Sequence, residues 1–512
     1  MYFIFILVSN ILNLMKNFLF ALLTVFTVQT GFTQFESSSF TSTGRGGATT
    51  FATDYQAIGI NPANLGWEYK FDGKKVAFGL TEMAYSLHSE ALSKDDLRNS
   101  FKEMINGKGD KFTYAEKIQA AEDFAQTGLA FNADLGSFGI AYMNEKVGGI
   151  GFRINDKIQF YSMLGSTASD LFFKGRTSNY FDLLTYVDTT GLSNDTTIIA
   201  NNGNLSADSA GNVISGQASI PLNFSELFAN SQISMTWTRE YNLSYGRKLV
   251  GLDSTFMLYG GVGVKFVQGL ALLDMESDGN TLTAFSAASP VFGIDYGTAA
   301  NSNPSAILGP NSGFLPDPVG KGWGFDIGFN AVIKNKLKIG FSVTNIGSIT
   351  WDGNVYSAKD TLLFDTENEG LNSYNVVNQL GDLVGDEGVF SWNGLASKKV
   401  NLPTMFRAGA SLRFSDKIEL GCDLLLPTNT VPGSLEGAMF GFGADITPVR
   451  WLNLSGGFVT GGNYDFQIPL GITLISKNGS YEMGVASRDA ITFFAQNGPT
   501  LSLSMGFMRF RF

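Results

Sequence analysis

Apolar and polar residues alternate along much of the chain with a period of two. Between residues 233 and 245, apolar side chains occupy every second position over thirteen residues, and only Arg239 interrupts the series. The same alternation recurs at 323–333, 337–343, 406–414 and 501–507. Such strands exceed the roughly 5–6 residues usual in soluble sheets, and they match a tilted bilayer crossing of about 9–11 residues.

This pattern predicts an all-β fold, a transmembrane antiparallel β-barrel whose apolar side chains face lipid. Soluble sandwiches alternate too, but the long strands and the low charged fraction of 16% favour a barrel. The strand count depends on two polar segments, 135–137 and 155–157. If both are bulges within strands the barrel has 14 strands, and if both are turns it has 16. We predict 14 and a location in the cell outer membrane.

Two short polar segments fit tight hairpin turns. Residues 415–417 separate the apolar Phe414 and Ile418, and an odd number of turn residues keeps one face of the hairpin apolar. Residues 334–336 do the same, with Asn335 able to adopt the left-handed conformation of a three-residue turn. Short links alternate with longer polar loops, as periplasmic turns and external loops do in outer-membrane barrels.

The last strand carries a terminal Phe512, which is typical of outer-membrane barrels. The apolar alternation slips by one residue between Phe507 and Met508, so this terminal pattern is imperfect.

Residues 1–34 have the layout of a secretory signal peptide. Lys16 precedes an apolar run over 18–26, and small and polar residues lead to a predicted cleavage near Gln34. Met15 fits the natural start of such a signal. An uncleaved anchor helix is the alternative, although several Asn and Ser residues would interrupt it.

A helical insertion is predicted at about 92–127. Ser93 to Asp96 has the form of a helix start with a short acid at the third position, and Thr113 to Glu116 is a full capping box. If the strand over 76–87 is the first to ascend, this insertion lies outside the cell.

The composition excludes several classes of protein. Acidic residues outnumber basic ones by 46 to 35, so nucleic-acid binding is not expected. One Cys and one His leave no basis for a disulfide scaffold, a Cys/His metal site or a cofactor. His88 would have to serve any serine-histidine hydrolase, and the sequence contains no Gly-x-Ser-x-Gly elbow, so we expect no enzyme activity.

The alternation also predicts which charged side chains point into the barrel. Arg413 should lie opposite Glu419 across the hairpin. Such charges are either pore-lining or plug-contacting groups, or structural pairs in a filled lumen, and pairing is favoured because an unpaired buried charge is costly. The predicted lumen charges are Lys265, Asp326, Arg407, Arg413, Glu419, Asp423 and Asp445.

Two N-terminal motifs resemble those of a known family. A glycine-rich start with Gly44, Gly46 and Gly47 precedes Asn61, Pro62 and Ala63. This resembles the hatch segment of FadL-type outer-membrane transporters. Segments 344–347, 402–404 and 446–452 are similar to the PorV and PorQ kind of FadL-superfamily barrel, which accompanies type IX secretion.

The resemblance implies that residues 35–72 form a plug inside the lumen and that residues 73–512 form the barrel. Long polar loops at 188–220, 274–320 and 352–400 depart from the family pattern. Outer-membrane lipid is the expected surrounding. The function expected is uptake of hydrophobic or small molecules, and the alternative is a non-enzymatic scaffold that binds secreted or surface proteins.

Overall fold

The computed structural model describes most of the chain beyond its N-terminal segment. The predicted signal peptide, residues 1–34, lies outside the described residues. All described residues belong to one compact unit, Phe32–Phe512. They are residues 39–67, 73–89, 92–96, 98–99, 111–125, 127–188, 195–252, 255–307, 316–373, 390–435, 437–462, 464–491, 494 and 500–512.

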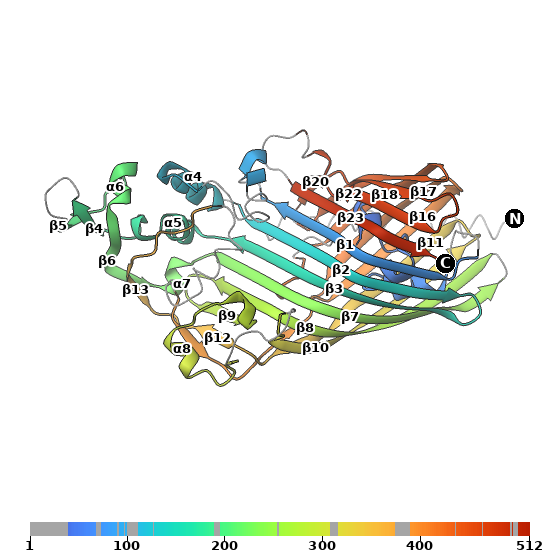
Figure 1. Ribbon diagram of the computed structural model, residues 1–512, viewed down its shortest axis with the longest axis horizontal. Helices are drawn as coiled ribbons and strands as arrows, with labels where there is room; N and C mark the ends of the chain where they lie inside the picture. The colour runs from blue at the N-terminus through green and yellow to red at the C-terminus, as the bar shows by residue number, and fades with distance from the viewer. Residues whose placement is uncertain are drawn as a thin grey trace, which may run out of the picture. The chain divides into compact units, whose positions relative to one another are not determined.

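Fourteen antiparallel strands of the described chain close into a barrel (Figure 1). Each pairs with the next, and the last pairs with the first, with Met83 opposite Met505. The barrel strands are β1 (Val76–His88), β2 (Leu129–Asn144), β3 (Gly148–Met163), β7 (Ser231–Leu252), β8 (Phe256–Ser277), β10 (Gly320–Ile333), β11 (Leu337–Trp351), β16 (Met405–Ser415), β17 (Ile418–Pro427), β18 (Met439–Val449), β19 (Leu452–Gly461), β21 (Leu470–Ile475), β22 (Tyr481–Ser487) and β23 (Thr500–Arg511).

The predicted count of 14 strands is confirmed. Strands β2 and β3 run without interruption through 135–137 and 155–157, so neither segment is a turn. The register of this pair shifts between Gly136 and Phe138, which leaves Ser137 as a bulge.

The outer face of the barrel is apolar at alternate positions. In β10, Trp323, Phe325 and Phe329 are 56%, 55% and 45% exposed, whereas Asp326 and Asn330, on the opposite face of the strand, are buried. A closed sheet with apolar residues outside and polar residues inside is the architecture of outer-membrane barrels. The predicted fold class and outer-membrane location follow from this arrangement.

The turn at 334–336 has the predicted geometry. Ile333 lies opposite Leu337, and both Lys334 and Asn335 have positive φ angles, of 50° and 53°. The three intervening residues therefore keep both flanking apolar side chains on the outer face.

The turn at 415–417 is one residue shorter than predicted. Ser415 pairs with Ile418, so the turn has two residues, and a bulge lies between Arg413 and Ser415. Arg413 still pairs with Glu419 as expected. The extra residue in this bulge takes the place of the third turn residue, so the flanking apolar side chains remain on one face of the hairpin.

The longer connections emerge at the barrel end away from the C-terminus, and several of them fold together (Figure 1). A second sheet has four strands in the order β13 (Leu362–Thr366), β6 (Val213–Asn223), β4 (Leu183–Asp188) and β5 (Asp195–Ala200). Phe173 and Phe228, from the connection between β3 and β7, share one apolar cluster with Phe390, from the connection between β11 and β16. The loops expected to be long and polar are therefore partly a folded external body with its own core.

The elements outside the barrel wall are short. They are α4 (Tyr114–Phe124), α5 (Ser166–Lys174), η3 (Gly175–Thr177), β4 (Leu183–Asp188), β5 (Asp195–Ala200), α6 (Ala207–Gly211), β6 (Val213–Asn223), α7 (Phe224–Leu227), β9 (Leu282–Ala288), η4 (Pro290–Phe292), α8 (Thr298–Asn301), β12 (Val355–Ala358), β13 (Leu362–Thr366), β14 (Trp392–Gly394), β15 (Lys398–Asn401) and β20 (Tyr464–Gln467). No helix of the described chain has the length and apolarity needed to span a bilayer.

Helix α4 begins with the predicted capping box. The Thr113 hydroxyl accepts from the Glu116 backbone N–H, and the Thr113 N–H donates back to the Glu116 carboxylate at 2.7 Å. These hydrogen bonds hold the pKa of Glu116 below its ordinary value. In the first predicted helix, Ser93 and Asp96 hydrogen-bond to each other, while most of the following segment lies outside the described residues.

Barrel closure can be tested by joining its first and last strands. In a Cys422→Ser background, a Met83→Cys/Met505→Cys pair should form a disulfide, because directly opposed Cα atoms of an antiparallel ladder lie within disulfide reach. A Met83→Cys/Leu501→Cys pair, displaced by four residues along β23, is the control. On a denaturing gel the cross-linked chain should migrate faster than its reduced form, and equal cross-linking of both pairs would contradict the register.

Candidate functional site: a plugged lumen with an amphipathic cavity

Residues 39–67 lie inside the barrel and contact its wall. They form three short elements, α2 (Phe40–Thr43), η1 (Asp54–Ala57) and η2 (Pro62–Gly66). Most of their side chains are buried, including those of Phe40, Tyr55 and Leu65. We call this segment the plug.

The Asn61–Pro62–Ala63 motif ties the plug to the wall. The Asn61 carboxamide oxygen accepts from the Ala63 backbone N–H at 3.1 Å and caps η2, while Pro62 occupies the first turn, where no donor is needed. The Asn61 Nδ2 donates to the carbonyl oxygens of Phe329 and Phe341, each at 3.4 Å. The motif thus begins η2 and binds two wall strands, β10 and β11.

The glycine-rich start of the plug passes close to a different group of wall strands, which includes β17 and β21. A Cβ on Gly44 would lie 2.8 Å from the Cα of Gly471 in β21. Gly46 has a φ of +66°, which favours glycine. Gly47 lies against Asp423, which would be 3.4 Å from an added Cβ. Gly44 therefore has a steric reason and Gly46 a conformational one, whereas a side chain at Gly47 would make only an ordinary contact.

Wall glycines create the space that the plug backbone occupies. A Cβ on Gly443 would overlap the carbonyl oxygen of Arg45 and lie 2.7 Å from its carbonyl carbon. A Cβ on Gly261 would overlap the peptide that joins Pro62 to Ala63. Sequence analysis did not assign these glycines, although their lumen-facing parity was a usable signal.

Two predicted lumen acids bind the plug directly. Asp445 accepts from Arg45 Nε at 2.6 Å. Asp423 accepts from the backbone N–H groups of Ala48 and Thr49, at 2.5 and 2.7 Å, and interacts electrostatically with the buried Arg407. These acids anchor the start of the plug, because a carboxylate that accepts from backbone donors forms strong charge-assisted hydrogen bonds.

Glu419 has a closer partner than the one predicted. Lys338 Nζ lies 2.8 Å from the Glu419 carboxylate, and the Ser411 hydroxyl donates to it at 2.9 Å. Arg413 Nε is 3.7 Å away, and its side chain is 27% exposed. Lys338 is therefore the principal cation at this site.

Lys265 and Asp326 form a buried ion pair at 3.2 Å. Lys265 also lies 3.8 Å from Glu240, which in turn pairs with Lys157 at 3.0 Å. The charges of β3, β7, β8 and β10 therefore form one chain of alternating sign across the wall.

A further cluster of charges joins the plug to the last strands, and sequence analysis missed it. Arg509 lies 2.6 Å from Asp54 and 2.9 Å from Glu482, and Arg511 lies 2.5 Å from Glu482. The one-residue slip near Phe507 turns both arginines inward. The slip is visible in the sequence, but only the pairing of β23 with β1 shows that it turns these side chains into the lumen.

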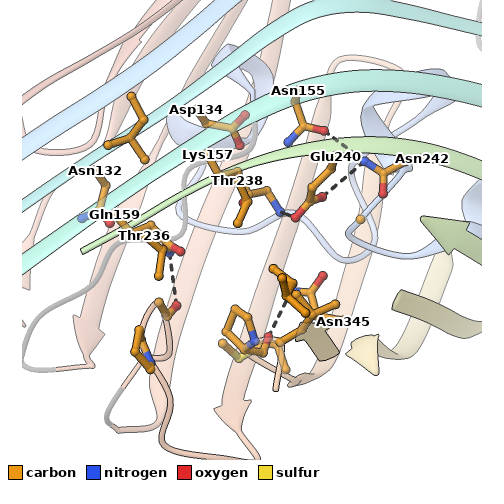
Figure 2. A pocket seen from close by; sticks show the side chains of 18 of the residues that line it. Asn132, Asp134, Asn155, Lys157, Gln159, Thr236, Thr238, Glu240, Asn242 and Asn345 are labelled. Atoms are coloured by element: carbon orange, nitrogen blue, oxygen red, sulfur yellow. Dashed lines mark hydrogen bonds and ion pairs between the residues drawn. The ribbon is translucent and has the colours of Figure 1, made fainter. Parts of the chain in front are cut away.

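A cavity lies between the plug and the external end of the barrel (Figure 2). The cavity and its opening to solvent together comprise about 1150 Å³ of space free of atoms. Ile58 and Ile60 of the plug contribute to its lining, as do Pro432 and Leu435 of an external connection. Its position makes it the space that a molecule entering from outside would meet before the plug.

The cavity has one polar wall and one apolar wall. On the polar wall, β-sheet register aligns Asn132, Gln159 and Thr236 in one row across β2, β3 and β7, and these side chains point into the cavity (Figure 2). The next rows toward the plug contain charged residues: Asp134, Lys157, Glu240 and Arg153. The apolar wall contains Leu272, Ile349, Trp351, Leu402 and Met405.

Fold and site together define a closed transmembrane β-barrel with a lumenal plug and an amphipathic cavity. Residues 79–478 match the model of a family of unknown function, DUF5723, and the chain belongs to that family. No curated protein matches the chain.

The chain is similar in architecture to solved FadL-family transporters. The Ralstonia pickettii toluene transporter TbuX is 11% identical, with a TM-score of 0.43 over 93% of this chain and 98% of that one. A Pseudomonas aeruginosa FadL homologue is 12% identical, with a TM-score of 0.39 over 94% and 98%. The Pseudomonas putida toluene transporter TodX is 9% identical, with a TM-score of 0.39 over 94% and 99%.

The fit between plug and wall can be tested at Gly443. Gly443→Ala should displace the plug, since overpacking of this kind costs about 1–3 kcal/mol and would open the contact roughly ten-fold or more often. Trypsin should then cleave after Arg45 faster than in the unsubstituted protein. In the control, Gly251→Ala, the nearest atom is the flexible Lys248 Cδ at 3.3 Å, and equal cleavage of both variants would contradict this contact.

The partners of Glu419 can be ranked by substitution. Lys338→Met should lower the free energy of unfolding by up to about 3 kcal/mol, because it breaks the closest buried pair. Arg413→Met should cost less than about 1 kcal/mol, as expected of a longer, partly exposed pair. Urea unfolding in detergent measures both. A larger loss of unfolding free energy in Arg413→Met than in Lys338→Met would contradict this ranking.

Proposed function

We propose that the protein takes up small hydrophobic or amphipathic molecules through the outer membrane and that the cavity is their binding site. The observation that carries this proposal is an apolar wall inside an otherwise polar lumen. Ile349, Trp351 and Leu402 belong to one buried cluster that faces this space. Apolar walls with a few polar groups are the usual lining of small-molecule sites.

The contacts that hold the plug in the lumen are compatible with its movement during uptake of a molecule. Its contacts with the wall include ion pairs and hydrogen bonds, such as those of Arg45 with Asp445 and Asn61 with Phe341. Neutral hydrogen bonds such as those of Asn61 can be exchanged for water when a segment shifts, with a small net change in free energy for each, whereas separation of the Arg45–Asp445 pair requires water to reach both charges. Movement of the plug would connect the cavity to the periplasmic end of the barrel.

A scaffold that binds a protein partner is the second candidate function. Its specific support is a group of exposed apolar side chains on the external four-stranded sheet. Ile220, Ile198 and Phe364 are 83%, 63% and 58% exposed. Exposed apolar groups of this size are frequent at protein-binding surfaces.

The transport proposal predicts that filling the cavity blocks uptake. Thr238→Trp should reduce protein-dependent entry of radiolabelled 1-octanol by about ten-fold, since a bulky ring would occupy the binding space. Host cells whose lipopolysaccharide layer slows passive entry provide the measurement. Ile446→Trp, at an outward-facing position that is 43% exposed, is the control and should leave the rate unchanged.

The same assay separates the two candidates. A folded protein that gives no uptake above the empty host would refute transport and leave the scaffold. Uptake that falls equally in both tryptophan variants would refute the cavity as the binding site.

A further inference from the structure

We propose that the cavity selects neutral amphipathic molecules, with a polar head that both donates and accepts hydrogen bonds, and that Asn132 is the residue that recognises this head. The inference rests on the proposed function and deepens it by naming the class of molecule. It is carried by the pairing of the wall charges and by the hydrogen bonding of Asn132.

The charged rows of the polar wall are already balanced. Lys157 lies 3.0 Å from Glu240, and Arg153 lies 4.0 Å from Asp134, so two cations face two carboxylates. A charged ligand would have to separate one of these pairs, and this is unfavourable because both carboxylates, those of Glu240 and Asp134, are buried and would lose their cation. The wall therefore disfavours anions and cations and favours a neutral head.

Asn132 belongs to the neutral row on the external side of these charges. Its side chain is 2% exposed, and within the described residues neither its amide oxygen nor its amide nitrogen has a hydrogen-bond partner. Buried amides are nearly always hydrogen-bonded, because an amide group that loses water and gains no partner destabilises the fold. A ligand with one donor and one acceptor would satisfy both atoms.

Gln159, the neighbour of Asn132 in this row of polar side chains, already has a hydrogen-bond partner, so recognition of the polar head falls to Asn132. Gln159 donates its Nε2 to the carbonyl oxygen of Gly433 at 3.1 Å, which fixes its orientation across the cavity. On the facing apolar wall, the Trp351 Nε1 is a second buried donor for which the described part of the chain provides no acceptor. The ligand would place its head at Asn132 and its body against Trp351, Ile349 and Leu272.

Binding of three probes with one chain length tests the inference. Octanamide, octanoate and octylammonium carry neutral, negative and positive heads at pH 7.4. Equilibrium dialysis of the radiolabelled probes against the full chain in nanodiscs, corrected with empty nanodiscs, should show about ten-fold tighter binding of octanamide than of either ion. This ranking requires no variant, so it does not depend on the folding of a substituted protein.

Substitution then tests Asn132 itself. Asn132→Leu should weaken octanamide binding by about ten-fold, since it removes both hydrogen bonds at nearly constant volume. Thr236→Val, in the same row, should weaken it less. The matched control is Asn453→Leu, a half-buried asparagine of β19 that does not line the cavity, and its affinity should be unchanged.

The outcomes distinguish this inference from the proposed function. Equal binding of all three probes, or unchanged octanamide binding in Asn132→Leu, would overturn the neutral-head inference while octanol uptake still supported transport. If no probe binds and octanol does not enter, both are overturned.

Discussion

Closure of the sheet is the constraint on which the rest of this structure depends. Within hydrocarbon a backbone N–H or C=O has no water to bind, and a strand with an open edge would leave a full row of these groups unpaired. Pairing of β23 with β1 removes that edge. Once the ring is closed, every second side chain faces lipid and the rest face a lumen too wide for wall side chains alone to fill, so its filling becomes the next structural problem.

The lumen is filled by backbone as well as by side chains. The plug runs so close to the wall that glycine is needed at Gly443 and Gly261, where any Cβ would meet plug backbone. Its charged contacts lie where wall carboxylates such as Asp423 and Asp445 reach inward. Close approach and charge pairing thus act together, because low local dielectric strengthens a pair once water is excluded.

The cavity lies on the external side of the plug, where plug backbone and side chains no longer fill the lumen. Toward the plug the wall consists of paired charges, whereas toward the outside it changes to Asn132, Gln159 and Thr236 and faces an apolar wall that includes Trp351. Beyond it, separate connections build an external body around Phe173, Phe228 and Phe390. The space between plug and external body is therefore chemically two-sided, which suits a molecule with a polar head and an apolar tail.

The sequence alone determined the barrel, favoured 14 strands over 16 and identified several of the inward charges, because period-two alternation reports directly which face of a strand meets lipid. The inner positions of Lys265, Asp326 and Asp423 followed from that parity. Tertiary structure decided which charges meet: Lys338 rather than Arg413 is closest to Glu419, and Arg509 reaches Asp54 across more than four hundred residues. Such pairings, like the external core and the cavity, depend on register, bulges and the path of the plug, and a local pattern does not contain the distance between remote segments.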